Sequence, residues 1–350
     1  MKLRLLTLIY YAMMALPTMA QIVNIPDSNF KAALISEGVD LNNDGEIQVT
    51  EAQLIDSLFI RNRNIFDLTG IEAFTSLRKL YCEYNNLTII DIGSNAALTH
   101  LYCTGNQISI LDVSKNSSLK VLDCPANPLK NLDVSKNSAL EILYCAESQI
   151  ENLNVSGCIA LTDLYCSVNK LEYLDVSANA LLTHLFCENN QLETLDASSN
   201  PALKYLYCGV NKITILNAGN NVYLRELSCN NNLIASLDVR GDSMLSYLNC
   251  MDNPNLSEIC VTYQQYAASM APETEQFWNK DFNASWSLDC SNSIADINKK
   301  NIVPELLHIY NIAGQEVNGP DIKDGIYIFQ NSDGSVRKIC KISNHVQKIK

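Results

Sequence analysis

The sequence predicts an α/β-class solenoid that is mostly β structure and contains little helix. The first observation is a set of nine cysteines, each 21 residues after the one before, with no insertion or deletion between them. They are Cys82, Cys103, Cys124, Cys145, Cys166, Cys187, Cys208, Cys229 and Cys250. The second observation is that the surrounding residues repeat too, as L-x-x-L-x-C-x-x-N-x-L-x-x-L-D-V-S-x-N-x-x. A stack of equal coils requires this constancy, whereas a globular core does not.

Each repeat predicts one short strand, of which Leu101, Tyr102 and Cys103 are an example. Successive side chains of a strand point to opposite sides, so Leu101 and Cys103 face the core while Tyr102 faces solvent. Stacking the coils then builds a parallel sheet along one side of the solenoid. The rest of a 21-residue coil is too short for a full helix and two turns, so we expect turns, extended segments or 3₁₀ pieces there.

An asparagine stands three positions after the cysteine in nearly every coil, and Ser148 is the exception. We expect these amides to point inward and to satisfy backbone groups where the coil leaves the strand. Loss of one would leave buried polar atoms without partners, at a cost of roughly 1–3 kcal/mol each. The members are Asn85, Asn106, Asn127, Asn169, Asn190, Asn211, Asn232 and Asn253.

The cysteine ladder is expected to consist of free, buried thiols, because a thiol is small and packs where a short coil has no room for leucine. Neighbouring ladder cysteines would lie about one strand spacing apart, roughly 4.8 Å. Their Cβ vectors run parallel, which leaves the Cβ atoms farther apart than the roughly 3.8 Å that a disulfide prefers. A metal–thiolate stack is the alternative, but a single file offers no tetrahedral cage.

The repeat resembles the leucine-rich repeat, with Cys in place of Leu at the sixth position. The first coil, "LFIRNRNIFDLTGIEAFTS" (58–76), has Ile60 in place of the cysteine, and its phrase "DLTGIEAFTSL" resembles internalin repeats. The later coils resemble those of the cysteine-ladder internalins. The resemblance covers about residues 55–257. It implies a right-handed coil with a concave parallel sheet, used as an extracellular binding scaffold, and it transfers no ligand.

The first 20 residues, "MKLRLLTLIYYAMMALPTMA", predict a signal peptide, with a basic start, an apolar stretch too short to span a bilayer, and small residues at the end. We therefore expect a secreted or outer cell-surface protein with no membrane span after cleavage. Cleavage removes Lys2 and Arg4 and no acid, so the net charge of −13 becomes −15. This charge disfavours nucleic acid and anionic membranes as partners.

Residues 21–54 predict a helical N-terminal cap that carries a calcium loop. "DLNNDGEIQVTE" (40–51) matches the twelve-residue EF-hand loop, with a glycine at the sixth position. The alternative is a turn that keeps the sequence but binds weakly. The expected ligands are Asp40, Asn42, Asp44, the carbonyl of Glu46, Gln48 and the bidentate Glu51. No organic cofactor is expected.

Residues 258–291 lose the period and predict a C-terminal cap over the last open coil. Cys260 and Cys290 bracket this segment, and we expect a disulfide between them. In the chain-entropy model, this disulfide would stabilise the folded chain by on the order of 3–4 kcal/mol.

Residues 292–350 predict a linker followed by a small β-sandwich. "IYNIAGQEV", "GIYIF" and "DGSVRKICK" resemble the type A sorting domain of the Bacteroidota type IX secretion system. The resemblance implies contact with that secretion machinery and passage across the outer membrane. The tail "ISNHVQKIK" extends beyond the usual basic ending of such domains.

An outward aromatic file precedes the cysteines on the predicted concave face. Aromatic files bind proteins or glycans, although stacked aromatics also stabilise a sheet by roughly 0.2–1 kcal/mol per pair. The predicted ligand-binding residues are Tyr81, Tyr102, Tyr144, Asp163, Tyr165, His184, Phe186, Tyr205 and Tyr207. A second file, of aspartates such as Asp112, predicts capped turns or, alternatively, a cation file.

The predicted function is an adhesin or protein-binding scaffold that uses the concave sheet. The alternative is a glycan-capturing or envelope-structural surface protein. An enzyme is not expected, because His100 and His184 are four coils, or about 19 Å, apart and cannot share a metal. The sequence also lacks a nucleophile elbow, a phosphate loop and a zinc-hydrolase motif.

Overall fold

The computed structural model describes residues 21–219, 221–262, 265 and 277–288, and three strands at 308–311, 325–330 and 336–342. It divides into two compact units, Met1–Asp289 and Cys290–Lys350. The predicted signal peptide, Cys290, and most of the predicted linker and sorting domain lie outside the described residues. The predicted domain boundaries therefore stay predictions.

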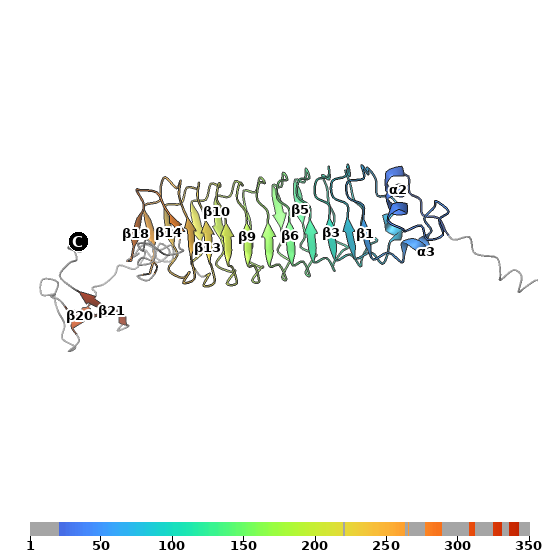
Figure 1. The fold of residues 1–350 in the computed structure, drawn as a ribbon. Coiled ribbons are helices and arrows are strands. Elements are labelled where there is room, and N and C mark those ends of the chain that lie inside the picture. The colour runs from blue at the N-terminus through green and yellow to red at the C-terminus, as the bar shows by residue number, and fades with distance from the viewer. Residues whose placement is uncertain are drawn as a thin grey trace, which may run out of the picture. The chain divides into compact units, whose positions relative to one another are not determined.

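A parallel sheet, here called the main sheet, runs the length of the first unit (Figure 1). Each strand pairs with the next at a shift of one coil, so that Leu80 lies opposite Leu101 and Leu101 opposite Leu122. The mostly-β parallel solenoid with little helix is therefore confirmed. In spatial order, the strands of the main sheet are β1 (Ser57–Phe59), β2 (Lys79–Tyr81), β3 (His100–Tyr102), β4 (Val121–Asp123), β6 (Ile142–Tyr144), β8 (Asp163–Tyr165), β9 (His184–Phe186), β11 (Tyr205–Tyr207), β13 (Glu226–Ser228), β15 (Tyr247–Asn249) and β17 (Phe277–Asn279).

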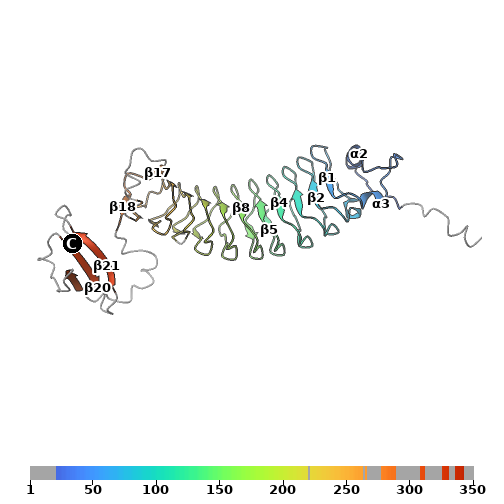
Figure 2. The same ribbon diagram turned by 60° about the horizontal axis from the view of Figure 1, so that its bottom comes forward.

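The return path of the coils forms a second face, which carries residues such as Ile110 and Asp112. Turns, extended segments and the 3₁₀ helix η1 (Ile71–Ala73) make up this path, as the coil length predicts. Short parallel strands also form on it, as Figure 2 shows for β5 beside the main sheet. These strands are β5 (Asn131–Asp133) with β7 (Asn152–Asn154), β10 (Thr194–Asp196) with β12 (Ile215–Asn217), and β16 (Glu258–Cys260) between β14 (Ser236–Asp238) and β18 (Ser285–Ser287).

Helices close the N-terminal end of the solenoid. Helix α2 (Ser28–Ser36) buries Phe30 and Leu34, and the short helix α3 (Val49–Ala52) follows it. Asp27 caps α2, because its Oδ1 accepts the N–H groups of Asn29 and Phe30. Its Oδ2 accepts the N–H groups of Phe66 and Asp67 in the first coil. One carboxylate thus joins the cap to the repeats.

The ladder cysteines are free and buried in the core, as the sequence predicts. Cys82 Sγ lies 3.4 Å from the carbonyl oxygen of Tyr102 in the next coil, and Cys124 Sγ makes the same contact with Tyr144. Burial raises the pKa of the Cys166 thiol to about 12. The ladder therefore consists of protonated packing groups and offers no thiolate.

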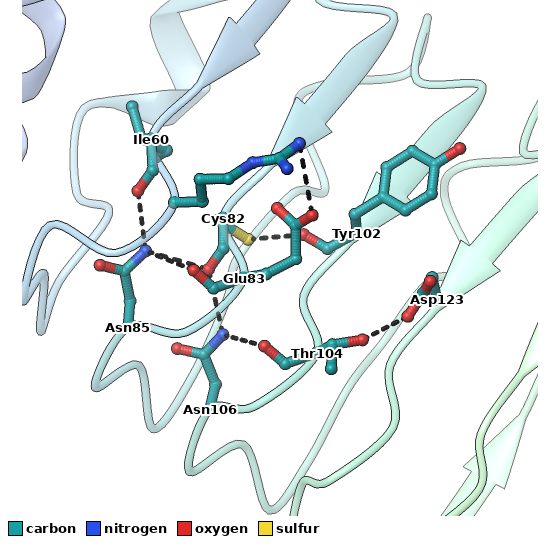
Figure 3. A network of polar contacts seen from close by, with 9 residues as sticks. Ile60, Cys82, Glu83, Asn85, Tyr102, Thr104, Asn106 and Asp123 are labelled. Carbon is teal, nitrogen blue, oxygen red and sulfur yellow. Dashed lines mark hydrogen bonds and ion pairs between the residues drawn. The ribbon is translucent and has the colours of Figure 1, made fainter.

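Two ladders of buried asparagine amides bind each coil to the one before it. In the predicted ladder, Asn106 Nδ2 donates to the carbonyls of Cys82 and Cys103, at 3.1 and 2.9 Å, and Figure 3 shows the contact with Cys82. Its Oδ1 accepts the N–H of Leu87. The sequence analysis did not identify the second ladder, in which Asn116 Nδ2 donates to the carbonyls of Ile92 and Asn95. This ladder comprises Asn95, Asn116, Asn137, Asn179, Asn200 and Asn221, all fully buried.

The coil of residues 140–160 interrupts both ladders. Ser148 breaks the first ladder, and the N–H of Leu129 turns back to the carbonyl of Asn127. Cys158 breaks the second, where its Sγ lies 3.1 Å from the carbonyl oxygen of Val134. The preceding residue must be glycine, because a Cβ on Gly157 would lie 1.8 Å from the Ser135 carbonyl oxygen. The shorter side chain and the glycine thus allow a closer approach of these coils.

A left-handed residue follows the strand in each coil. Val168 and Val210 adopt φ of 56° and 55°, and their N–H groups donate to Glu188 and Asn230 of the next coil. A β-branched residue in this region is strained, so the hydrogen bond and the packing of the stack outweigh local preference.

The C-terminal end of the solenoid is closed by residues outside the repeat. Trp278 and Trp286 lie 5.5 Å apart between ring centroids and pack against the core. Gln265 Nε2 donates to the carbonyls of Val239 and Asp242, which continues the second amide ladder by one step. Cys260 is disulfide-bonded. Its predicted pairing with Cys290 stays a prediction, because Cys290 lies outside the described residues.

In the second unit, three described strands form one antiparallel sheet. Strand β20 (Gly325–Gln330) pairs with β19 (His308–Asn311) on one side and with β21 (Val336–Ile342) on the other. The predicted β-sandwich involves residues outside the described ones and stays a prediction. Within the described parts of both units, we find no helix that is long and apolar enough to span a membrane.

Asp242 occupies a position of the second ladder where the previous coil has Asn221. Asn221 Nδ2 donates to the carbonyls of Ala197 and Asn200. The fully buried Asp242 carboxyl lacks the pair of carbonyl contacts that Asn221 makes in the previous coil. Burial, followed by the negative charge of Asp238, raises the pKa of Asp242 from 3.8 to about 8.

We predict that Asp242→Asn stabilises the protein at neutral pH. Between about pH 4 and pH 8 the folded chain keeps a proton that the unfolded chain has lost, so the wild-type free energy of unfolding falls as pH rises. The amide does not titrate, and the gain should grow from near zero at pH 4 to a few kcal/mol at pH 8. Urea unfolding of both proteins at pH 4, 6 and 8 measures it. A gain that is equal at all three values contradicts the prediction.

Candidate functional site

The register of the main sheet places the outward aromatic side chains next to one another. Tyr81 lies opposite Tyr102, and Tyr144 lies opposite Tyr165. These rings are partly exposed and the leucines beside them are fully buried, because successive residues of a strand alternate between solvent and core. The predicted concave face is this outer face of the main sheet.

The first part of the file is a stack of three rings. Tyr81 lies between Phe59 and Tyr102, with centroid distances of 4.5 and 4.6 Å and interplanar angles of 12° and 4°. Phe59 was not among the predicted residues. Its signal is its position directly before Ile60, where later coils have the aromatic before the cysteine. Arg61 lies 5.3 Å from the Tyr81 ring centroid and pairs with Glu83 at 3.6 Å.

The second part of the file contains four rings. Tyr144 and Tyr165 are stacked at 4.4 Å, and Phe186 and Tyr207 are stacked at 4.6 Å. Between these pairs, Tyr165 and Phe186 meet in a T-shaped contact, at a centroid distance of 4.9 Å and an interplanar angle of 86°. Each inner ring thus has a neighbour on both sides.

A shorter file lies beside the second part, two residues earlier in each strand. The His184 ring stacks on Tyr205 at 4.7 Å, and its Nδ1 lies 2.7 Å from Asp163 Oδ1. The structure therefore brings the predicted residues Asp163, His184 and Tyr205 together beside Tyr165, Phe186 and Tyr207. Tyr81 and Tyr102 belong to the separate first stack.

Two tyrosine hydroxyls of this face, those of Tyr165 and Tyr207, have raised pKa values. Burial, followed by the neighbouring Tyr144 and Asp163, raises the pKa of Tyr165 to about 12. Burial, and then the hydrogen bond that Tyr207 donates to Glu226, raise the pKa of Tyr207 well above its usual range. At Tyr165 and Tyr207 the face therefore presents neutral hydroxyls.

Asp123 separates the two parts of the aromatic file. It lies in β4, in register with Tyr102 on one side and Tyr144 on the other. Thr104 Oγ1 donates a hydrogen bond to Asp123 Oδ1, which Figure 3 shows beside Tyr102. Burial raises the pKa of the Asp123 carboxyl.

The predicted calcium loop, residues 40–51, makes a left-handed turn at its glycine. Gly45, at the sixth position, has φ of 83°. Asp40 accepts the N–H groups of Asp44 and Gly45 through its two carboxylate oxygens. Glu51 accepts the N–H of Leu41 through Oε1 and that of Gln48 through Oε2. These bonds fold the loop so that its polar side chains turn toward one another.

The donor set of this loop suits a hard cation. Asn42 Nδ2 lies 3.0 Å from Asp44 Oδ2 and 3.0 Å from Gln48 Oε1. The Glu46 side chain pairs with Lys31 at 2.7 Å, which leaves its backbone carbonyl for the seventh position. Among the described residues, no group of three or more His, Cys, Asp or Glu side chains is placed to hold a metal. A cation here would depend on mixed carboxylate, amide and carbonyl oxygens.

Several hollows lie on the second face of the described solenoid. One of them, of about 600 Å³, is lined by residues of the interrupted coil such as Glu151 and Asn154, and by Tyr173, which is 67% exposed. A second, of about 290 Å³, lies between Ile89 and Ile110. These hollows are a surface that the sequence analysis did not identify.

The aspartate file lies on the second face and caps turns. This is the first of the two predictions made for it, capped turns or a cation file. Asp112 Oδ1 accepts the N–H of Ser114 at 2.9 Å, and the Ser114 side chain and backbone hold the pKa of Asp112 below its usual range. In five further coils the Oδ1 of the aspartate accepts the backbone N–H two residues later. The acceptor and donor pairs are Asp91 and Gly93, Asp133 and Ser135, Asp175 and Ser177, Asp196 and Ser198, and Asp238 and Arg240.

This geometry defines a leucine-rich-repeat solenoid with a cysteine ladder. No protein-family model matches the chain. Over 70 residues the chain is 37% identical to internalin J of Listeria monocytogenes, a stretch that is 20% of this chain and 8% of that protein. The chain thus matches only a small part of this relative's length.

The solved structure of a Listeria monocytogenes internalin shares the fold. Internalin C2 matches with a TM-score of 0.52 at 20% identity, over 59% of this chain and 95% of that chain. The functional domain of InlJ, which includes a cysteine ladder, matches with a TM-score of 0.44 at 21% identity, over 90% of this chain and 96% of that chain. The resemblance to the internalins is therefore supported at the level of fold. The predicted resemblance to a type IX sorting domain stays a prediction.

Proposed function

We propose that this chain is a secreted or cell-surface scaffold that binds a protein partner through the outer face of its main sheet. The observation that carries the proposal is the aromatic file, whose rings are partly exposed and held in register from β1 to β11. Aromatic side chains on a rigid frame contribute large contact areas at little cost in conformational entropy. The leucine-rich-repeat fold is compatible with this role, which is an argument by analogy.

The stacking favours a protein over a glycan. A sugar ring packs on a free aromatic face, but Tyr81 is stacked on both faces, and Tyr165 is stacked on Tyr144 and in edge contact with Phe186. Apart from the end rings of each part, the file therefore offers mainly ring edges and hydroxyls, to which a protein surface can donate and accept hydrogen bonds. We assign no catalytic role to the face.

A secreted or cell-surface scaffold must be exported, and the two ends of the chain would serve this export. Residues 1–20 would direct the chain out of the cytoplasm, and residues 292–350 would engage the type IX secretion machinery. The motifs of the sequence support this route.

We predict that the triple variant Tyr144→Ser, Tyr165→Ser, Tyr207→Ser binds its partner at least about tenfold more weakly, a loss of 1.4 kcal/mol or more. The partner is first identified by screening the purified chain against panels of extracellular proteins and of glycans, and dissociation constants are then measured. Circular dichroism checks that the variant is folded.

The matched control is Tyr173→Ser, which removes an exposed tyrosine from the second face. Its dissociation constant should equal that of the wild type. A partner lost by Tyr173→Ser and kept by the triple variant places recognition on the second face and contradicts the proposal. A partner found only among the glycans favours the glycan-capturing alternative.

We also propose that the loop from Asp40 to Glu51 binds Ca²⁺. Its glycine turn, its backbone hydrogen bonds and its oxygen donors support this proposal. The bound ion would stabilise the N-terminal cap by mass action, because the unfolded loop does not gather its ligands.

We predict that calcium raises the melting temperature of the wild type and that Glu51→Gln removes this rise. The single oxygen of glutamine can keep the hydrogen bond from the Gln48 N–H that caps α3, but the bidentate carboxylate and one of its backbone contacts are lost. Thermal unfolding in calcium and in chelator measures the difference, and Glu172→Gln, on the second face, serves as control. A rise of equal size in Glu51→Gln rules out this loop as the source of the effect.

A further inference from the structure

The aromatic file is interrupted by a gap with a carboxylate in it. One face of Tyr102 is covered by Tyr81, at an interplanar angle of 4°, and one face of Tyr144 is covered by Tyr165. The remaining faces of these two end rings are turned toward β4 from opposite sides. The register places Asp123 between them. We name this arrangement of Tyr102, Asp123 and Tyr144 the Asp123 notch.

The width of the notch follows from the sheet. Tyr102 and Tyr144 lie on strands separated by one strand, so their backbones are about 9.6 Å apart at a strand spacing of roughly 4.8 Å. A planar group inserted midway would lie about 4.8 Å from each ring, within the roughly 6 Å over which a cation is attracted by an aromatic face. Val121 and Ile142, half-buried on β4 and β6, give the notch an apolar border.

The electrostatics of the notch favour a cation. Two ring faces and one carboxylate are all electronegative, and none of the ion pairs in the described part of the chain involves Asp123. Thr104 holds Oδ1 and thereby orients the carboxylate, while Oδ2 remains for a ligand. The raised pKa of Asp123 is consistent with a carboxylate that burial has deprived of water without supplying a positive partner.

The first stack already contains the same combination of groups within the molecule. Arg61 lies near the ring of Tyr81 and pairs with the carboxylate of Glu83. A guanidinium is planar, weakly hydrated and able to contact a ring and a carboxylate together, whereas an ammonium is compact and strongly hydrated. The free notch offers a comparable ring and carboxylate, and a second ring besides.

We propose that the Asp123 notch binds an arginine side chain of the protein partner, with the guanidinium between Tyr102 and Tyr144 and against Asp123. This inference rests on the proposed function, since it specifies how the same face recognises its partner. The net charge of −15 that signal-peptide cleavage would leave favours a basic partner for the chain.

The test uses Nα-acetylarginine amide as probe, titrated into the purified chain at low ionic strength and followed by NMR chemical shifts. Nα-acetylcitrulline amide, which has nearly the same shape and no charge, is the matched probe. We expect millimolar binding of the arginine probe and at least fivefold weaker binding of the citrulline probe. Undetectable binding of the arginine probe, or equal binding of both, overturns the proposal.

Asp123→Tyr is the decisive variant, because it continues the aromatic file through β4 as the neighbouring coils do and so closes the notch without disturbing the strand. This variant should bind the arginine probe at least tenfold more weakly than the wild type does. Ser228→Tyr adds a tyrosine at the same register beyond Tyr207 and should leave binding unchanged. Asp123→Asn, which keeps the notch open, should give an intermediate loss. Wild-type affinity in Asp123→Tyr overturns the proposal.

The proposal and the proposed function can fail separately. One outcome is a protein partner that requires Tyr165 and Tyr207 and yet binds Asp123→Tyr with wild-type affinity. This result supports the outer face of the main sheet as the binding site and overturns the proposal for the Asp123 notch. Probe binding that Asp123→Tyr abolishes, in a chain for which no protein partner is found, upholds the notch and removes the support for the proposed function.

Discussion

The structure depends on side-chain amides that are buried between its coils. In the first ladder each asparagine donates both to a carbonyl of its own turn and to one of the preceding coil, as Asn127 does to Cys124 and Cys103. In the second ladder each asparagine donates to two carbonyls of the preceding coil, as Asn116 does to Ile92 and Asn95. The carbonyls at these turns have no partner within a strand, so the amides supply the hydrogen bonds that burial demands. Because every amide spans two coils, a coil that slipped by one residue would leave donors and acceptors unpaired on both sides.

This fixed register gives the outer face its order. Rings that recur at one strand position must lie one strand spacing apart, which is close to the distance at which aromatic rings stack. The small thiol in the core has a related effect, because it lets a 21-residue coil close without a leucine. Ser148 and Cys158 interrupt the amide ladders, and the surface changes there too, since a hollow of about 600 Å³ on the second face is lined by the same coil.

Much of this architecture could be predicted from the sequence. The nine evenly spaced cysteines determine the parallel stack, and the Asn that follows each one indicates a structural amide. The second ladder was missed because its asparagines lie in a D-V-S-x-N stretch typical of turns, and because Cys158 and Asp242 break the series. The period also contains no information about ring orientation. The free faces of Tyr102 and Tyr144, and hence the role of Asp123, follow only from interplanar angles in three dimensions.

The central claim of this account is that the buried amides hold the coils in register. The most direct measurement is the urea unfolding of Asn127→Ala, beside Asn152→Ala, which removes an exposed asparagine of the second face. The account predicts that Asn127→Ala lowers the free energy of unfolding by about 3 kcal/mol or more, because several buried carbonyls and the N–H of Ile108 lose their partner. Asn152→Ala should lower it by less than about 0.5 kcal/mol. Equal, small losses in the two variants would contradict the account.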